Sequence, residues 1–184
     1  MNTVKPALGS FIHRSLGTTN NNHFSCDADP EWHSSCIFET LGDQSHWRPA
    51  EQTTPLSFEG LANAAEIAIH PDIQHFYGSF WAGSLQGKTD EGPLSLIQLW
   101  NEEDFERLIE NLVGHLFMKM RSKQPFTVFF ATTEEHSELF LSIDNATGKV
   151  LLEEPGKPPL REVETDIATF LNRLEPDTSL PLIY

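Results

Sequence analysis

The sequence NEEDFERLIENLVGHLFMKMRSK, residues 101–123, is the clearest structural element of this chain. Apolar residues recur along it at spacings of three and four, which is the period of one buried face of an α-helix and not that of a strand. They are Phe105, Leu108, Ile109, Leu112, Val113, Leu116, Phe117 and Met120. We therefore expect one long helix whose apolar face lies against the rest of the fold.

Both ends of this helix carry residues that stabilise helix ends. Asn101 is a suitable N-cap, because its side-chain oxygen can accept a free N–H of the first turn, and Asp104 approximates the partner of a capping box. Acidic residues lie at the positive end of the helix dipole and basic residues at its negative end: Glu102, Glu103 and Asp104 against Lys119, Arg121 and Lys123. Pro125 then ends the helix.

Away from the apolar stripe, the helix is acidic. Glu103, Glu106 and Glu110 are three and four residues apart and share one side, with Glu102 beside them. Such a side is either a solvated acidic surface or part of a docking surface for a basic partner. The helix pattern alone leaves both interpretations open.

Composition limits the class of protein. A chain of 184 residues with thirteen Phe and four Trp is expected to fold as one domain with its own core. No apolar run is long enough for a transmembrane helix, and the first residues lack the apolar core of a signal peptide. Two cysteines do not indicate a disulfide scaffold. We therefore expect a cytosolic location, unless a partner holds the protein at a membrane.

The formal net charge is −15. A general field of this sign disfavours binding to nucleic acid or to anionic lipid, and it favours a basic partner.

Three further segments have helical periodicity. They are residues 6–16, where Pro6 precedes the apolar residues; residues 57–69, with Ser57 as cap; and residues 165–174, with Thr165 as cap. Pro71 either ends the second segment or starts another helical turn through Phe76.

Strand-type residues fill most of the remaining chain. They predict a hairpin over residues 36–47 with its turn at Gly42-Asp43, and strands over residues 77–85, 94–100, 126–132, 138–144 and 149–153. Residues 17–35 and 86–93 are expected to be loops, and residues 177–184 a tail. The mixed order predicts an α+β fold: a single domain with one mixed, mostly antiparallel sheet flanked by helices.

One spacing is compatible with a metal site. His23, Cys26, His33 and Cys36 form two His-x2-Cys pairs, and both residue types bind zinc. The gap between the pairs is short for a zinc finger, so ordinary surface histidines and packed cysteines are the preferred interpretation, and no cofactor is predicted.

Motifs of the common enzyme classes are absent. The chain has no GxSxG, Walker A, GxGxxG, HExxH or EF-hand pattern. His115 in the long helix has no nucleophile tied to it by spacing, so a packed, hydrogen-bonded role is expected. Adjacent acids such as Glu134-Glu135 and Glu153-Glu154 are expected to be solvated. The sequence therefore predicts no enzymatic activity.

Local acidity beside aromatic residues recurs instead. Asp90-Glu91 precedes a predicted strand, the acids named above begin the long helix, and Glu134, Glu135 and Glu138 lie at the next loop between strands. If these groups meet on one surface, they would attract Lys/Arg-rich segments, and Tyr77 or Trp81 could add contacts if exposed.

Several stretches together resemble one protein family. They are HPDIQHFYGSFWAG (70–83), LIQLWNEEDFERLIENLVGHL (96–116), FTVFFATTEE (126–135), ATFLNRLEP (168–176) and SSCIFETLGDQSHWRP (34–49). This pattern resembles Syd, the SecY-interacting protein family of Gram-negative bacteria, although Ser35 stands where proline is usual. The likeness defines residues 35–176 as a Syd-like domain, preceded by a weakly matching segment, residues 1–34.

The resemblance implies a non-enzymatic protein, peripheral on the cytoplasmic side of the inner membrane. It would bind SecY, the channel subunit of the protein translocase, and regulate or check SecY that is not properly complexed. It implies no nucleic-acid binding and no direct membrane insertion. The family is similar to bacterial immunity proteins, so neutralisation of a basic toxin is the alternative. The acidic residues expected at the partner surface are our own inference.

Overall fold

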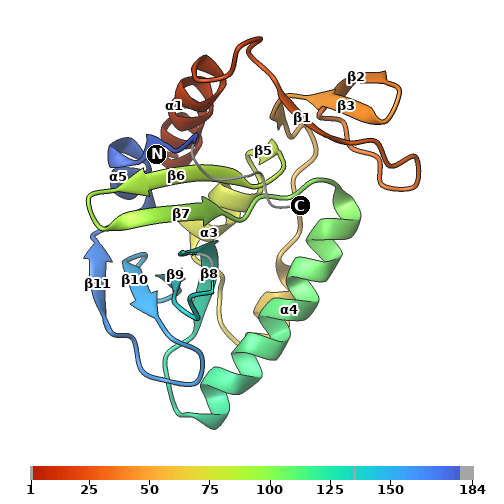
Figure 1. Cartoon of the computed structure of the whole chain (residues 1–184). Helices are drawn as coiled ribbons and strands as arrows, with labels where there is room; N and C mark the ends of the chain where they lie inside the picture. The colour runs from red at the N-terminus through yellow and green to blue at the C-terminus, as the bar shows by residue number, and fades with distance from the viewer. Residues whose placement is uncertain (1, 135, 179–184) are drawn as a thin grey trace.

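Residues 2–134 and 136–178 are described by the structure, a computed structural model (Figure 1). Within them the chain forms five helices and three sheets whose strands pair antiparallel. The α+β class and the antiparallel pairing are confirmed. The expectation of one sheet is wrong, because short strands near the N-terminus pair with one another and not with the main sheet.

The main sheet has seven strands in the order β11-β10-β9-β8-β7-β6-β12 and curls like half of a barrel (Figure 1). Its strands are β6 (Leu85–Thr89), β7 (Gly92–Leu96), β8 (Thr127–Thr132), β9 (Phe140–Asp144), β10 (Val150–Glu153), β11 (Arg161–Glu164) and β12 (Glu175–Pro176). Residues 86–93, expected to be a loop, are largely strand, because β6 and β7 meet in a tight turn at Asp90-Glu91. Strands β11 and β12 were not predicted.

A separate three-stranded sheet has the order β1-β3-β2. The predicted hairpin forms its core, as β2 (Ile37–Leu41) and β3 (Gln44–Trp47), and Gly42 supplies the positive φ of +62° at the turn. Residues 17–35 are not all loop, because β1 (Phe24–Asp27) pairs with β3. Two short strands, β4 (Ala50–Glu51) and β5 (Phe80–Trp81), form the third sheet.

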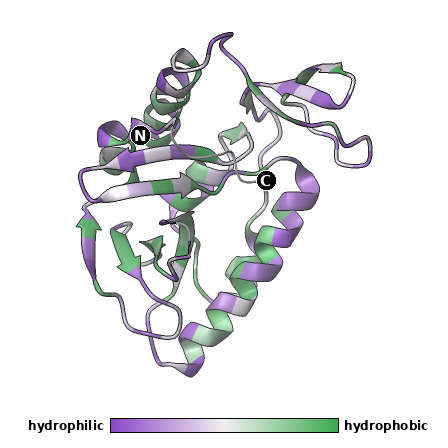
Figure 2. Cartoon of the chain, in the orientation of Figure 1, coloured by the Kyte–Doolittle hydropathy of each residue, from purple (hydrophilic) through white to green (hydrophobic). Residues whose placement is uncertain are grey.

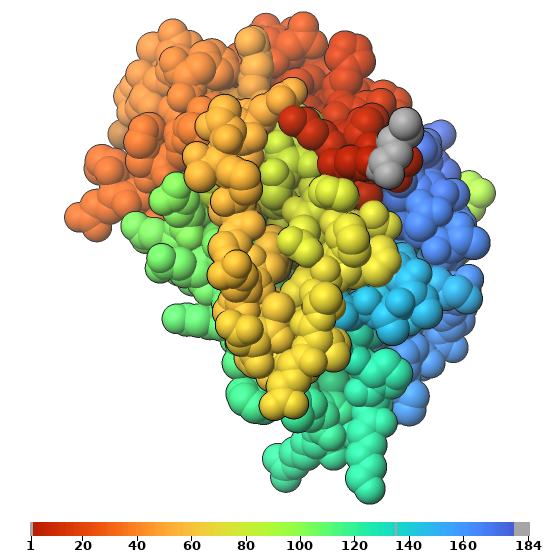
Figure 3. Space-filling model, turned by 180° about the vertical axis from the view of Figure 1, so that it is seen from behind, coloured from red at the N-terminus to blue at the C-terminus, as the bar shows by residue number. Residues whose placement is uncertain are grey.

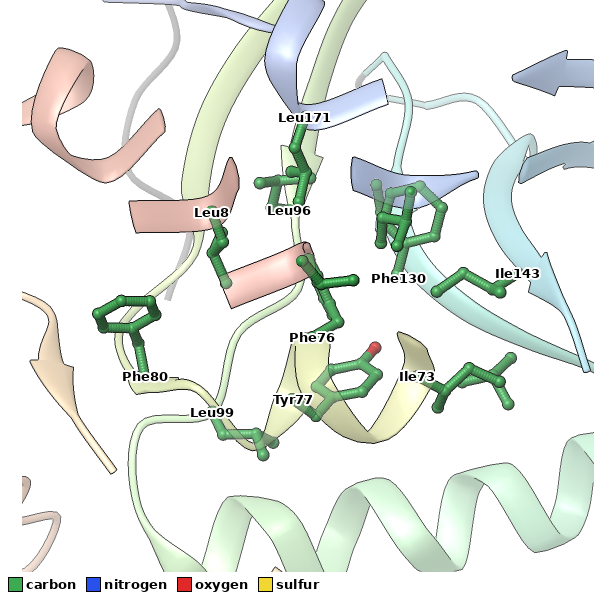
Figure 4. Close-up of a cluster of buried hydrophobic side chains, with 14 of the residues drawn as sticks. Leu8, Ile73, Phe76, Tyr77, Phe80, Leu96, Leu99, Phe130, Ile143 and Leu171 are labelled. Atoms are coloured by element: carbon green, nitrogen blue, oxygen red, sulfur yellow. The ribbon is translucent and has the colours of Figure 1, made fainter. Parts of the chain in front are cut away.

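The helices cover both faces of the main sheet. They are α1 (Val4–Gly17), α2 (Glu59–Ala65), α3 (Pro71–Tyr77), α4 (Glu102–Arg121) and α5 (Ile167–Arg173). Figure 4 shows Leu8 of α1, Phe76 of α3 and Leu171 of α5 beside Phe130 and Leu96 of the sheet, and all five side chains are buried. Because successive side chains of a strand point to opposite faces, Phe129 lies on the other face of β8, where α4 packs.

Several local expectations need correction. Helix α2 ends at Ala65 and not at Ile69, because Glu66 adopts a left-handed φ of +55°. The N-cap of α2 is Phe58, and Asp166, not Thr165, caps α5 by accepting the N–H of Thr169. Pro71 starts α3, which confirms one of the two alternatives predicted for it.

Candidate partner-binding surface

Two side-chain hydrogen bonds, one accepted by Asn101 and one by Asp104, stabilise the first turn of α4. Asn101 Oδ1 accepts the N–H of Asp104 at 3.0 Å, which confirms the predicted N-cap. Asp104 Oδ2 accepts the N–H of Trp100 at 3.0 Å, one residue before the position of a capping box. These hydrogen bonds hold the acidic first turn of α4 in a defined position next to Trp100.

A cleft of about 390 Å³ lies beside this helix start. The elements around it are β1, the chain between β1 and β2 with the start of β2, the segment after β5, the segment between β7 and α4, and the first turns of α4 (Figure 1). We call it the α4 cleft; its lining residues are Cys26, Asp27, Asp29, Trp32, Ile37, Ala82, Gly83, Ser84, Gln98, Trp100, Asp104 and Arg107.

Hydrogen bonds fasten the wall of the cleft to α4. The Trp100 indole N–H donates to the carbonyl of Trp32 at 3.1 Å, and Asn101 Nδ2 donates to the carbonyl of His33 at 2.8 Å. Ser34 Oγ donates to the carbonyl of Trp100 at 2.5 Å. The three-stranded sheet is thereby held against the helix start, so the cleft has a defined shape.

The cleft is acidic, with three carboxylates and one guanidinium in its lining. Arg107 lies 4.4 Å above the Trp32 ring, a cation–π contact that holds it at the wall. Burial raises the pKa of Asp104, and Glu103 adds to the rise, whereas the Trp100 N–H and Arg107 act in the opposite direction. A further cation in the cleft would stabilise the charged form of Asp104.

Gln98, one of the residues that line the cleft, has a buried amide oxygen. Gln98 is 8% exposed, and its Nε2 donates to the carbonyl of Ile97 at 3.1 Å. Its Oε1 is buried and has no hydrogen-bond partner among residues 2–134 and 136–178. A buried acceptor without a partner costs free energy. Because this oxygen atom is itself fully buried, a partner in the cleft reaches it only if the Gln98 side chain turns.

The predicted acids on α4 lie next to this cleft. Glu102, Glu103, Glu106 and Glu110 are all exposed, and Glu103 directly precedes the cleft residue Asp104. Figure 2 shows hydrophilic residues on the outer side of the first turns of α4. Trp81 is half-buried, and the next three residues, 82–84, line the cleft.

The other predicted acids do not join them. Asp90 and Glu91 lie at the opposite end of β7 from α4 (Figure 1). Glu91 forms an ion pair with Arg161, and both line a second cavity of about 210 Å³ together with Glu134. Glu135 lies outside the described residues.

Tyr77 is not available to a partner. It is 1% exposed, its hydroxyl donates to the carbonyl of Phe129 at 2.6 Å, and burial raises the pKa of its phenol. Its expected role as a surface contact is therefore wrong.

Sequence reasoning missed several cleft residues. Asp27 and Asp29 fall in the segment that was expected to be loop, and Gln98 lies in a stretch that reads as a strand. The acids flanking Trp32 in DADPEW were the available signal. The two His-x2-Cys pairs do not meet as a ligand set: within residues 2–134 and 136–178, no group of three or more His, Cys, Asp or Glu could hold a metal ion.

Comparison of the sequence with known proteins assigns the chain to a family. The model of the Syd protein (SUKH-2) family matches residues 5–176. The chain belongs to the Syd family. The match begins within α1, so it includes most of the segment before residue 35.

Two curated Syd proteins are similar in sequence over nearly the whole chain. Protein Syd of Pseudoalteromonas atlantica is 38% identical over 184 residues, which cover 96% of this chain and 98% of that protein. Protein Syd of Alteromonas mediterranea is 34% identical over 176 residues, 95% of this chain and 97% of that protein. In the part of this Syd-family chain that the structure describes, no helix has the length and apolarity needed to span a bilayer.

Proposed function

We propose that this Syd-family protein binds the cytosolic face of SecY and acts by binding, without catalysis. The family resemblance supports this partner, and the α4 cleft with the adjoining acidic side of α4 supports the mode. Basic cytosolic loops of SecY dock on this surface, and the protein regulates or checks SecY that is not properly complexed. It is then peripheral on the cytoplasmic side of the inner membrane.

The chemistry of the cleft fits a lysine or arginine side chain. Asp27, Asp29 and Asp104 supply three negative charges against the single positive charge of Arg107 in the lining. The apolar parts of Trp32, Ile37 and Trp100 line the cleft and can pack against the stem of such a side chain. This combination of negative charge and apolar wall is the observation that carries the proposal.

The acidic side of α4 extends the surface beyond the cleft. Complementary charge raises the encounter rate with a basic loop and fixes its orientation. Since the α4 acids are exposed, their contribution is screened by salt within about 8–10 Å at physiological ionic strength. Binding is therefore expected to weaken as salt rises.

Reversal of charge on α4 tests the mode of binding. The double variant Glu106→Lys/Glu110→Lys leaves the first turn of α4 unchanged, so helix capping is preserved. The control Glu138→Lys/Glu175→Lys makes the same charge change at exposed residues outside the cleft and outside α4. Pull-down on SecY-containing membranes over a salt series should show at least about tenfold weaker binding for the α4 variant only.

Two results would contradict the proposal in different ways. Salt-insensitive binding that both variants retain would remove the acidic mode of docking. Crosslinking in cells that recovers a soluble basic toxin, and no SecY, would instead support the alternative of an immunity-type protein.

A further inference from the structure

The far end of α4 exposes a cluster of apolar side chains. Phe117 is 60% exposed, Met118 42% and Met120 59%. The sequence pattern placed Phe117 and Met120 on the buried face, but the structure turns them outward. We call these three residues the apolar tip. In the space-filling view the segment at the end of α4 projects from the lower edge of the molecule (Figure 3).

Free positive charge lies beside the apolar tip. Most lysine and arginine side chains are engaged: Glu153, for example, pairs with Lys119, and Glu154 pairs with Lys157. Counting only contacts between described residues, three cations have no side-chain hydrogen bond, ion pair or ring contact, namely Lys88, Arg121 and Lys123. Two of these three follow the apolar tip directly in the sequence.

We infer that the apolar tip, with Arg121 and Lys123, contacts the surface of an anionic lipid bilayer. Apolar side chains that enter the interface, next to cations that meet anionic headgroups, are the two signals that interfacial binding requires. The contact is shallow and needs no spanning helix, in agreement with the finding above. The sequence analysis expects a partner to hold the protein at the membrane; this inference adds a direct contact with lipid.

Size and shape favour lipid over a second copy of the chain. The apolar tip has three residues, far fewer than the roughly 20–30 residues that each partner contributes to a stable interface. A protein partner would need a hollow complementary to a projecting corner, whereas a bilayer offers a deformable plane.

The chain's negative charge does not prevent this contact. Glu110 lies seven residues before Phe117, which corresponds to about 10 Å along the helix, or about one screening length at physiological salt. Glu103 and Glu106 lie further away. Glu153 and Glu154, which line a small pocket together with Met118, are each paired with a lysine. The same helix thus presents its acidic half to the proposed basic loop and its apolar, basic end to the lipid beside it.

The test uses purified protein and vesicles without any protein, so it does not depend on SecY binding. The protein is floated with vesicles containing phosphatidylglycerol and with vesicles of phosphatidylcholine alone. Wild type should partition onto the anionic vesicles, and Phe117→Ser/Met120→Ser should reduce this partitioning at least about tenfold. Arg121→Ser/Lys123→Ser should reduce binding to the anionic vesicles.

Matched controls keep the test specific. Phe38 and Leu41 on the β2–β3 hairpin are similarly exposed, at 52% and 58%, and Arg48 beside Phe38 is already bound to the carbonyl of Asn22. Phe38→Ser/Leu41→Ser and Lys88→Ser should bind like wild type. Equal partitioning of wild type and the tip variant, or equal loss in the hairpin control, overturns the inference. A third result also overturns it. Wild type would self-associate in sedimentation, the tip variant alone would not, and neither protein would bind the vesicles.

Discussion

Two polar residues of α4 point into the protein and hold the helix on the sheet. His115 Nε2 lies 3.1 Å from Thr127 Oγ1, and the Lys119 ammonium pairs with Glu153, whose side chain is 0% exposed. Glu153 also accepts a hydrogen bond from Ser142 at 2.5 Å. Buried polar groups are costly without partners, so these contacts favour one register of α4 against β8, β9 and β10 over all others.

The buried histidine makes stability depend on pH. Burial lowers the pKa of His115 from its ordinary 6.5, Lys119 lowers it further, and Glu153 and Thr127 act in the opposite direction. Because the folded pKa is the lower one, the unfolded state binds more protons below pH 6.5. Stability is therefore fully present above that pH and is lost as the pH falls toward the folded pKa.

The variant His115→Gln isolates this effect. Glutamine can keep a hydrogen bond to Thr127 but does not titrate, so the variant should lose less stability than wild type between about pH 7.5 and pH 5.5. Urea unfolding at each pH measures both curves, and the carboxylates common to both proteins cancel in the difference. Parallel curves would show that His115 does not contribute.

At the scale of the element, α4 is rotated from the face that its apolar pattern indicates. Leu108, Leu112 and Leu116 are buried as expected, but the last two turns bury His115 and Lys119 in place of Phe117 and Met120. At the other end Phe105 packs on Phe58 of α2, with ring centroids 5.1 Å apart. The helix contacts α2 in its first half and the sheet in its second.

Neighbouring residues on α4 test this rotation. Leu116→Ala removes a side chain that is 3% exposed and should cost about 2–5 kcal/mol of unfolding free energy. Phe117→Ala removes a larger side chain that is 60% exposed and should change stability by less than about 0.5 kcal/mol. Denaturant unfolding of both variants decides: comparable losses would mean that Phe117 is buried in solution.

Local patterns predict elements better than they predict which side of an element is buried. The bounds of α4, its cap at Asn101 and the turn at Gly42 depend on neighbouring residues, so they could be predicted. The inward turn of Lys119 depends on Glu153, which lies 34 residues away. An apolar count therefore assigns Met120 to the core, because it cannot include a buried ion pair formed across the fold.

At the scale of the whole molecule, the α4 cleft exists because two sheets meet the start of one helix. Its walls come from β1, from the chain after β5 and from α4, which are far apart in the sequence. The acids of α4 could be proposed from helical spacing alone. Asp27, Asp29 and Gln98 could not, because their place beside α4 follows from the pairing of β1 with β3 and from the contacts of Trp100.

Trp100 connects the three-stranded sheet to the rest of the protein. It is 7% exposed, its ring meets that of Trp47 edge to face at 5.3 Å, and its indole N–H bonds the carbonyl of Trp32. The strands of this sheet pair with one another and not with the seven-stranded sheet. The three-stranded sheet should therefore open as a unit of lower stability than the seven-stranded sheet.

Trp100→Phe tests this at the scale of the molecule. The change removes the indole hydrogen bond and weakens the contact with Trp47, so hydrogen exchange in residues 24–27 and 37–47 should accelerate about tenfold or more. Protection in β8 and β9 should be nearly unchanged. The control Phe170→Leu, at a buried residue of α5, should lower protection in the main sheet instead. A uniform loss of protection in Trp100→Phe would mean that both sheets unfold together, and that the cleft cannot open without loss of the whole fold.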